Sequence, residues 1–350
     1  MNKIPKTMHG VWLIGHGDLD KLEVRNGIPV PTPDPHEVLI HVAAAAVNNT
    51  DINTRTAWYS KNQGDGEDAS WAGEALSFPR IQGADVCGRI VAVGDEIEKN
   101  RIGERVLIEP CIRQAKGQEL SQPWYFGSEC DGGFAQYTVV DANHAYKIES
   151  DLSDVELASF PCSYSTAENL LTRANVKAGE RVLITGASGG VGSAVIQLAK
   201  ARGAEVIAIT SAAKSSALLD LGADRTLSRE DGIIEKLGSN RIEVVIDLVA
   251  GSKWPEYLEV LCPHGRYAVA GAIGGPIVEL DVRTLYLKDL SLFGCTVLQP
   301  CVFSGLIEHI EQGRIVPLVA ETYDLGQIAA AQTSFLSKQH IGKIVLTIRS

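Results

Sequence analysis

A short glycine-rich segment is the part of the sequence whose residue types and spacing point most directly to chemistry. Residues 185–195 read TGASGGVGSAV and lie between the apolar stretch RVLI and the amphipathic stretch SAVIQLAKARG. A strand, a tight glycine-rich bend and a helix start form a phosphate-binding turn, because the first N–H groups of the helix point towards a pyrophosphate. The segment therefore predicts a dinucleotide-binding turn. The alternative is a strand-to-helix turn in an α/β protein that binds no nucleotide.

The turn supplies most of the expected cofactor contacts. Ala187 takes the place of the first glycine of the common fingerprint. Gly189 would let a pyrophosphate approach the backbone, and Gly192 would let the helix pack closely on the strand. The predicted cofactor-binding residues of the turn are Ala187, Ser188, Gly189, Gly190, Val191 and Gly192.

The next strand, EVIAIT, indicates which dinucleotide is bound. An NAD-binding turn usually places Asp or Glu at the end of this strand, bonded to the ribose hydroxyls. Here the strand ends in Thr210 and Ser211, and Lys214 follows. Two hydroxyls and an ammonium suit a 2′-phosphate, and no carboxylate repels it. We predict NADP(H), although Lys214 alone could be an ordinary lysine at a helix start.

Two regions of different predicted secondary structure position these residues. The first part is β-rich, with short apolar runs such as EVLIHVAAAAV and GRIVAVG, and it contains two expected loops, at 57–79 and 111–132. A helix is expected near residue 153, where Ser153 and Glu156 have capping-box spacing. From residue 181 strands and amphipathic helices alternate, and six strands predict a doubly wound parallel sheet with helices on both faces. The final strand, GKIVLTI, could rejoin the first part.

Composition excludes several classes of partner. The net charge is −11 at pH 7, which argues against nucleic acid and anionic membranes, because both need a basic face. No signal peptide or membrane span is evident, so a cytoplasmic protein is expected. The seven cysteines are scattered without a C-x-x-C pair, which disfavours a disulfide framework or a four-cysteine zinc knot.

Taken in order, several motifs resemble the medium-chain dehydrogenase/reductase superfamily. They are AAAAVNNTDINTR, FPRIQGADVCGRIVAVG, GERVLI, ASGGVG, LGAD and GKIVL, and they cover essentially the whole chain. The resemblance implies a GroES-like catalytic domain at residues 1–155 and 303–350. It also implies a Rossmann NADP(H)-binding domain at residues 156–302, with the active site between the domains.

The resemblance also implies which positions of the chain would supply zinc ligands. Where zinc-dependent relatives have Cys-His, this chain has Asn48-Asn49, and where they have Gly-His-Glu it has Gly83-Ala84-Asp85. Only Cys162 matches a ligand. Because catalytic zinc needs three protein ligands, no metal is predicted, and Cys162 is interpreted as a buried apolar residue.

The pattern instead looks like the zinc-free quinone oxidoreductase branch. That branch has an Asn followed by an Asp and a Tyr, matched here by Asn48, Asp51 and Tyr59. By resemblance, Asn48 would bond the substrate carbonyl or a water near the nicotinamide, and Tyr59 could line the pocket or supply a proton. Alternatively, Asn48 is an ordinary turn residue, and Tyr59 is a loop aromatic that packs on the domain. Thr166 and Lys343 lie in motifs that the resemblance places near the nicotinamide and phosphates, or both are merely structural.

The sequence therefore predicts an NADPH-dependent oxidoreductase that transfers hydride to a quinone or an activated α,β-unsaturated carbonyl compound. Such acceptors need positioning rather than a metal that acidifies an alcohol. The alternatives are a zinc alcohol dehydrogenase that uses Cys162 and Asp85, and a non-enzymatic NADPH-binding protein. A homodimer through the edge strand LSLFGCTVL is expected.

Overall fold

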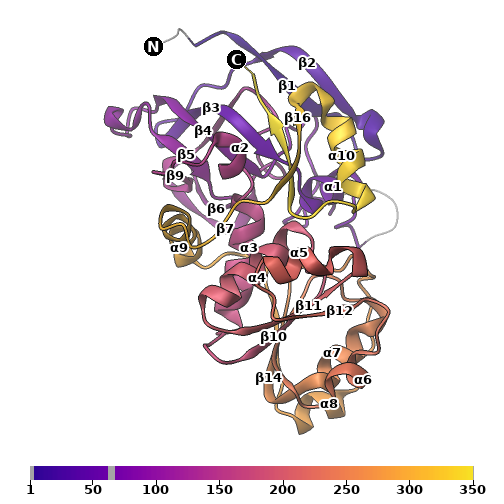
Figure 1. Cartoon of the computed structure of the whole chain (residues 1–350). Helices are drawn as coiled ribbons and strands as arrows, with labels where there is room; N and C mark the ends of the chain where they lie inside the picture. The colour runs from indigo at the N-terminus through magenta and orange to yellow at the C-terminus, as the bar shows by residue number, and fades with distance from the viewer. Residues whose placement is uncertain (1–3, 62–67, 350) are drawn as a thin grey trace. The chain divides into compact units, whose positions relative to one another are not determined.

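The computed structural model describes residues 4–61 and 68–349 (Figure 1). Its contacts divide the chain into two compact units, residues 1–162 with 317–350 and residues 163–316. The predicted domain boundaries, after residues 155 and 302, both fall earlier in the chain. The later boundary places helix α9 (Pro300–Glu311) in the second unit. The reason is that Asn169 donates to the Val297 carbonyl at 3.2 Å and accepts from the Gln299 amide at 3.4 Å, which ties the start of α9 to α3 (Pro161–Arg173).

The first unit is built on a seven-stranded, mostly antiparallel sheet. Its strands follow the order β16-β17-β3-β4-β5-β9, and β8 also pairs with β3. The bounds are β3 Glu37–Ala46, β4 Asp85–Val93, β5 Arg105–Ile108, β8 Tyr137–Asp141, β9 Ala145–Lys147, β16 Val319–Asp324 and β17 Lys343–Thr347. Strand β17 pairs with β3 from Val345–Ala46 to Thr347–Ala44, so the C-terminal strand does rejoin the first part.

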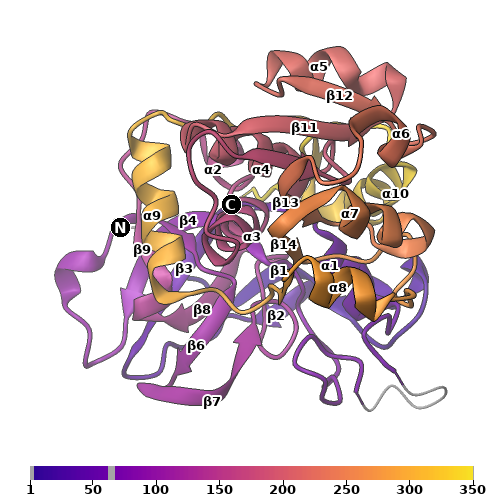
Figure 2. The same cartoon turned by 90° about the horizontal axis from the view of Figure 1, so that it is seen from below.

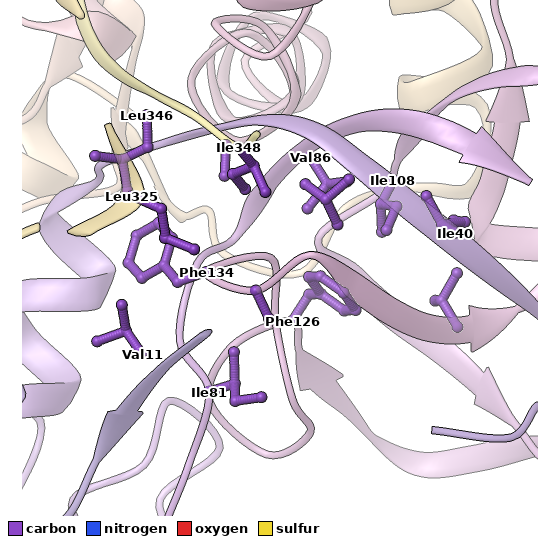
Figure 3. Packing of buried hydrophobic residues seen from close by; sticks show 14 of the residues in the cluster. Val11, Ile40, Ile81, Val86, Ile108, Phe126, Phe134, Leu325, Leu346 and Ile348 are labelled. Atoms are coloured by element: carbon purple, nitrogen blue, oxygen red, sulfur yellow. The ribbon is translucent and has the colours of Figure 1, made fainter. Parts of the chain in front are cut away.

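A large apolar cluster fills much of this unit. It gathers side chains from both ends of the chain, including Val11 near the N-terminus and Leu346 near the C-terminus, around Phe126 and Phe134 (Figure 3). Since all four are fully or almost fully buried, the two distant segments share one core. The other elements of this unit are β1 Thr7–Leu13, β2 Leu22–Pro29, β6 Cys111–Ala115, β7 Gln118–Tyr125, α1 Asn49–Arg55, α2 Asp154–Leu157 and α10 Ile328–Ser337.

The second unit is a doubly wound parallel sheet (Figure 2), as the alternating pattern predicts. Its strand order is β12-β11-β10-β13-β14-β15, and every neighbouring pair is parallel. The strands are β10 Arg181–Ile184, β11 Glu205–Thr210, β12 Arg225–Ser228, β13 Ile242–Asp247, β14 Leu261–Val269 and β15 Ser291–Gly294. The helices are α3 and α9, with α4 Gly190–Ala201, α5 Ser215–Asp220, α6 Ile233–Leu237, α7 Trp254–Val260 and α8 Val282–Leu287. In such sheets ligands bind at the carboxyl ends of the strands, where the strand order reverses.

One loop prediction is wrong. Residues 111–132 contain the hairpin β6–β7, in which Cys111 pairs with Tyr125 and Ala115 with Gln118. Lys116 and Gly117 form its turn, both with positive φ, so they suit a two-residue hairpin connection. The polar faces of the two strands hid this pattern in the sequence. The described part of the 57–79 loop has no helix or strand, and residues 62–67 lie outside the described residues.

The predicted capping box is present. The Glu156 amide donates to Ser153 Oγ at 3.2 Å, and the Ser153 amide donates to Glu156 Oε2 at 2.8 Å. Helix α2 therefore begins directly after Ser153. Among residues 4–61 and 68–349, no helix combines the length and apolarity that a membrane crossing requires.

Candidate active site and cofactor site

The glycine turn of the second unit joins β10 to α4 as the sequence predicts. Gly186 has φ +58, and Gly189 is the extended residue that precedes α4. The amide of Gly189 donates to the Gly186 carbonyl at 3.1 Å, which closes the bend. The first N–H groups of α4, from Gly190 to Gly192, have no acceptor within this twelve-residue helix, and a helix terminus of this kind can bind an anion. Ser188 and Val191 are half-buried beside it, and Ala187 is fully buried.

Two glycines of the turn meet different surroundings. A Cβ at Gly192 would lie 2.4 Å from the Gly186 carbonyl oxygen and 2.6 Å from Ala187 Cα, so only glycine fits there. A Cβ at Gly189 would meet nothing closer than the same oxygen, at 3.6 Å. Gly189 is exposed and has ordinary φ, so the protein itself does not require glycine there. An open backbone at this point is a cradle that a side chain would fill, which fits a dinucleotide.

Asp247, at the end of β13, organises the neighbouring loop, and the sequence analysis missed it. Its Oδ1 accepts from Thr185 Oγ1 at 2.5 Å and from the amides of Val249 and Ala250 at 2.9 and 3.1 Å. Its Oδ2 accepts from the Tyr267 hydroxyl at 2.5 Å. Asp247 is fully buried, so these four donors are what make its burial tolerable. The only available signal was an acidic residue at the end of a buried strand, in VVIDLV.

The loop after β13, which Asp247 holds in place, lies against the glycine turn. A Cβ at Gly186 would meet Val249 Cγ2 at 3.2 Å and Leu248 Cβ at 3.4 Å. Ala250 has φ +55 and ψ −136, a conformation that costs a non-glycine residue about 1–3 kcal/mol. Such strain persists only where neighbouring contacts impose it, and the bonds of Asp247 impose it here.

The carboxyl end of β11 opens on a cavity of about 280 Å³. Five of its seven lining residues carry hydroxyls; the lining consists of Thr210, Ser211, Ala212, Ser215, Thr226, Leu227 and Ser228. The buried Oγ1 of Thr210 has no hydrogen-bond partner among the described residues. A buried hydroxyl without a partner, beside a cavity lined by hydroxyl-bearing residues, fits the ribose end of a dinucleotide.

Two cations lie near this cavity. Burial, and then the neighbouring Arg229 guanidinium, lower the pKa of Lys214 below its ordinary value. Arg229, whose amide donates to the Thr210 carbonyl at 3.1 Å, is a residue that the sequence analysis missed. Thr166 lies half-buried on α3, and its cofactor contact stays a prediction.

The first unit brings Asn48 and Asp51 together at the start of α1. The Asn48 amide donates to Asp51 Oδ2 at 2.8 Å, and the Gly83 amide donates to Asp51 Oδ1 at 3.2 Å. Asn48 is the residue that precedes the helix, and Asp51 is its third residue, which is capping-box geometry. Asp51 is thus buried for a structural reason. The Tyr59 hydroxyl donates to Thr50 Oγ1 at 3.1 Å, and burial raises the pKa of Tyr59.

Lys343 lies in this cluster of the first unit, and its predicted cofactor contact stays a prediction. Its Nζ is 2.8 Å from Asp85 Oδ2 and also donates to Asn48 Oδ1. The Asn48 side-chain amide donates to Asp85 Oδ2 at 2.8 Å and to the Ala46 carbonyl at 3.2 Å. Both of its N–H groups are therefore engaged within the protein, in contrast to the expected donation to a substrate carbonyl.

An aromatic wall borders the cluster. The Cys162 amide donates to Asp85 Oδ1 at 2.6 Å, and the Cys162 thiol is 3.1 Å from the Tyr125 hydroxyl. The ring of Tyr125 is 5.0 Å from that of Trp71. Burial, and then the Asp85 charge, raise the pKa of Cys162 to about 12, so the side chain is a neutral thiol.

These residues do not fit a catalytic zinc ion. Both oxygens of Asp85 already accept from protein donors, and the Lys343 ammonium takes the cation's place beside them. Within the part of the chain that the structure describes, no group of three or more His, Cys, Asp or Glu side chains is placed to hold a metal.

Asp51 is expected to make stability depend on pH. Burial raises its pKa to about 7 from its ordinary 3.8, so between these values the folded state binds one proton more than the unfolded state. Its contribution is fully present below pH 3.8 and is lost as the pH rises through 7, by at most about 1.4 kcal/mol per pH unit. Urea unfolding of the wild type and Asp51→Asn across this range measures it. The wild type should lose stability relative to the variant as the pH rises, and parallel curves would contradict the prediction.

Comparisons with known proteins match the chain to dehydrogenases and reductases over nearly its whole length. Residues 34–150 match the alcohol dehydrogenase GroES-like domain, and residues 190–312 match the zinc-binding dehydrogenase family. Human quinone oxidoreductase is 29% identical over 98% of each chain. Acryloyl-coenzyme A reductase of Metallosphaera sedula is 30% identical over 93% of this chain and 96% of its own. The crystal structure of a putative alcohol dehydrogenase from Sinorhizobium meliloti 1021 is 43% identical, covers 100% of this chain and 99% of its own, and has a TM-score of 0.90.

Proposed function

Because the chain belongs to the medium-chain dehydrogenase/reductase superfamily and is an oxidoreductase of its quinone oxidoreductase-like group, we propose that it uses NADPH to reduce quinones or activated α,β-unsaturated carbonyl compounds without catalytic zinc. The observation that carries the zinc-free proposal is the Lys343 ammonium beside Asp85, where zinc relatives have metal ligands. Relatives named quinone oxidoreductase and acryloyl-coenzyme A reductase support the substrate class.

The chain's own residues supply binding and orientation. The amides at the start of α4 would hold the pyrophosphate, and Thr210, Ser211 and Lys214 would hold the ribose with its 2′-phosphate. When bound, the reduced nicotinamide supplies the hydride. Asn48 hydrogen-bonds with Lys343 and Asp85 and so orients both side chains. Tyr59 would line the substrate pocket in the same unit. The aromatic wall of Trp71 and Tyr125 suits a flat conjugated acceptor.

An activity screen tests this function directly. The purified protein is assayed for NADPH oxidation with quinones, enones and aldehydes, and its metal content is measured. We expect turnover with the first two classes and no stoichiometric zinc. Alcohol oxidation that a chelator abolishes would support the second candidate, a zinc alcohol dehydrogenase, which the family match and the 43% identical putative alcohol dehydrogenase favour.

Cofactor preference is expected to depend on the two cations near the β11 cavity. Replacing both Lys214 and Arg229 by alanine should weaken NADPH binding by at least about 10- to 100-fold, because even one charge-assisted bond to a phosphate contributes about 1.5–3 kcal/mol. NADH binding should hardly change, so it serves as the control. Fluorescence titration with both cofactors measures the two affinities. Tighter NADH binding by the wild type would overturn the NADPH proposal.

A homodimer through the outer edge of β15 is part of the proposal. Strand β15 ends the sheet order and exposes Leu292, and the preceding helix α8 exposes Tyr286 and Leu287. Unpaired strand edges and apolar patches of this kind mark association surfaces. We expect light scattering to give a dimer for the wild type and a monomer for Leu287→Asp. A monomeric wild type would contradict this.

A further inference from the structure

A buried ammonium is the unusual feature of the first unit. Lys343 is 2% exposed, and a buried charge is costly unless it is paired and hydrogen-bonded. An ammonium has three N–H groups. Among residues 4–61 and 68–349, its polar contacts are Asp85 Oδ2 and Asn48 Oδ1. Two acceptors therefore account for two N–H groups, and one donor is left for a further acceptor.

The fold fixes the ammonium rigidly. Ala46, at the end of β3, pairs with Asp85 at the start of β4 on one side and with Val345 of β17 on the other. Lys343 begins β17, Asp85 begins β4 and Asn48 follows the end of β3, so these three neighbouring strands bring the residues together at one end of the strands. A site placed on strands is more precise than one placed on loops.

Asp85 balances the charge without using up the donor. Its carboxylate also accepts from Asn48 Nδ2 and from the Cys162 amide, so it is held by groups other than Lys343. The pair is neutral before substrate binds. It becomes an oriented donor that needs no rearrangement when negative charge develops nearby, which is the property of an effective oxyanion site.

We propose that Lys343 is a catalytic residue whose third N–H donates a hydrogen bond to the carbonyl oxygen of the substrate. This inference rests on the proposed function. The β-carbon of an enone accepts a hydride from reduced nicotinamide and forms a C–H bond, while the cofactor is oxidised. The π electrons shift so that a new double bond joins the α-carbon to the carbonyl carbon, and an electron pair moves onto the oxygen. The resulting enolate bonds to Lys343, and its α-carbon then takes a proton from water.

Loss of the Lys343 ammonium is expected to slow the reduction of enones more than the reduction of quinones. An enolate oxygen is more basic than the oxygen of a hydroquinone anion, so it gains more from a donor. Lys343→Met/Asp85→Asn removes the ammonium without leaving an unpaired buried carboxylate. We expect kcat to fall about 100- to 1,000-fold with an enone and about 10-fold with a quinone, with NADPH affinity unchanged. Lys343→Arg should restore part of the enone activity. Lys338→Met, which removes an exposed lysine that contacts Asn49, is the matched control and should behave as wild type.

A binding measurement tests the inference without turnover. The visible spectrum of p-nitrophenol, added with oxidised cofactor, reports whether the bound phenol is ionised. The wild type should lower the pKa of the bound phenol, and the double variant should not. Equal losses for enone and quinone, or an equal phenol pKa in both proteins, would overturn the inference. If the wild type reduces no quinone or enone at all, the proposed function fails instead.

Discussion

Replacing Gly192 by alanine is expected to lower the free energy of unfolding by about 1–3 kcal/mol and to weaken cofactor binding by at least about tenfold. The added Cβ would meet the Gly186 carbonyl oxygen at 2.4 Å and Ala187 Cα at 2.6 Å. Both contacts are with backbone, which cannot rotate away as a side chain can. Helix α4 must therefore move off β10, and its N-terminal amides move with it. Urea unfolding and cofactor fluorescence titration measure the two effects.

Gly189→Ala is the matched control within the same turn. Its Cβ would meet the protein no closer than 3.6 Å, so the stability of the protein without cofactor should stay at the wild-type level. Cofactor binding should nevertheless weaken, because the methyl group occupies the open backbone that a pyrophosphate approaches. If Gly189→Ala binds the dinucleotide as tightly as wild type, the turn is not its binding site. A Gly192→Ala protein as stable as the wild type would contradict the close packing of α4 on β10.

Replacing Asp247 by alanine is expected to lower the free energy of unfolding by at least about 3 kcal/mol, since each buried donor left unpaired costs about 1–3 kcal/mol. Four donors lose their acceptor, including the hydroxyls of Thr185 and Tyr267. Burial, and then the Asp247 charge, raise the pKa of Tyr267, so its hydroxyl stays a donor. The loop from Leu248 to Gly251 would relax from its strained form at Ala250 and lose its fit to the glycine turn.

Tyr267→Phe serves as the graded control. It removes one donor and leaves the other three bonds of Asp247, so a loss of about 1 kcal/mol is expected. Urea unfolding of the two variants, followed by cofactor titration where they fold, gives both comparisons. An Asp247→Ala protein as stable as Tyr267→Phe would show that the loop does not depend on this carboxylate.

Much of the second unit could be predicted from the sequence, because its signals are local. Apolar strands alternate with amphipathic helices, and the bend at Gly189 and Gly192 has a strand before it and a helix after it. The capping box at Ser153 and Glu156 is likewise a short-range pattern. The hairpin β6–β7 escaped prediction because its polar faces hide the alternation, although Lys116-Gly117 carried a turn signal.

The polar cluster could be predicted only in part. Asn48 and Asp51 are three residues apart, and their bond belongs to a helix start that the sequence can reveal. Lys343 is separated from Asp85 by most of the chain, so no spacing rule connects them. Asp247 and Arg229 were missed for a similar reason, since several of their partners lie far away in the sequence: Thr185 and Tyr267 bond to Asp247, and Thr210 bonds to Arg229.

The discontinuity of the first unit has a consequence for synthesis on the ribosome. Residues 163–316 form a unit with all its parts present before the last strand, β17, is translated. The earlier residues must wait, because β3 lacks its partner along Ala44–Ala46 and the buried carboxylate of Asp85 has no ammonium beside it. Although domains usually fold in the order in which they emerge, here the later-made unit is the first that can finish folding.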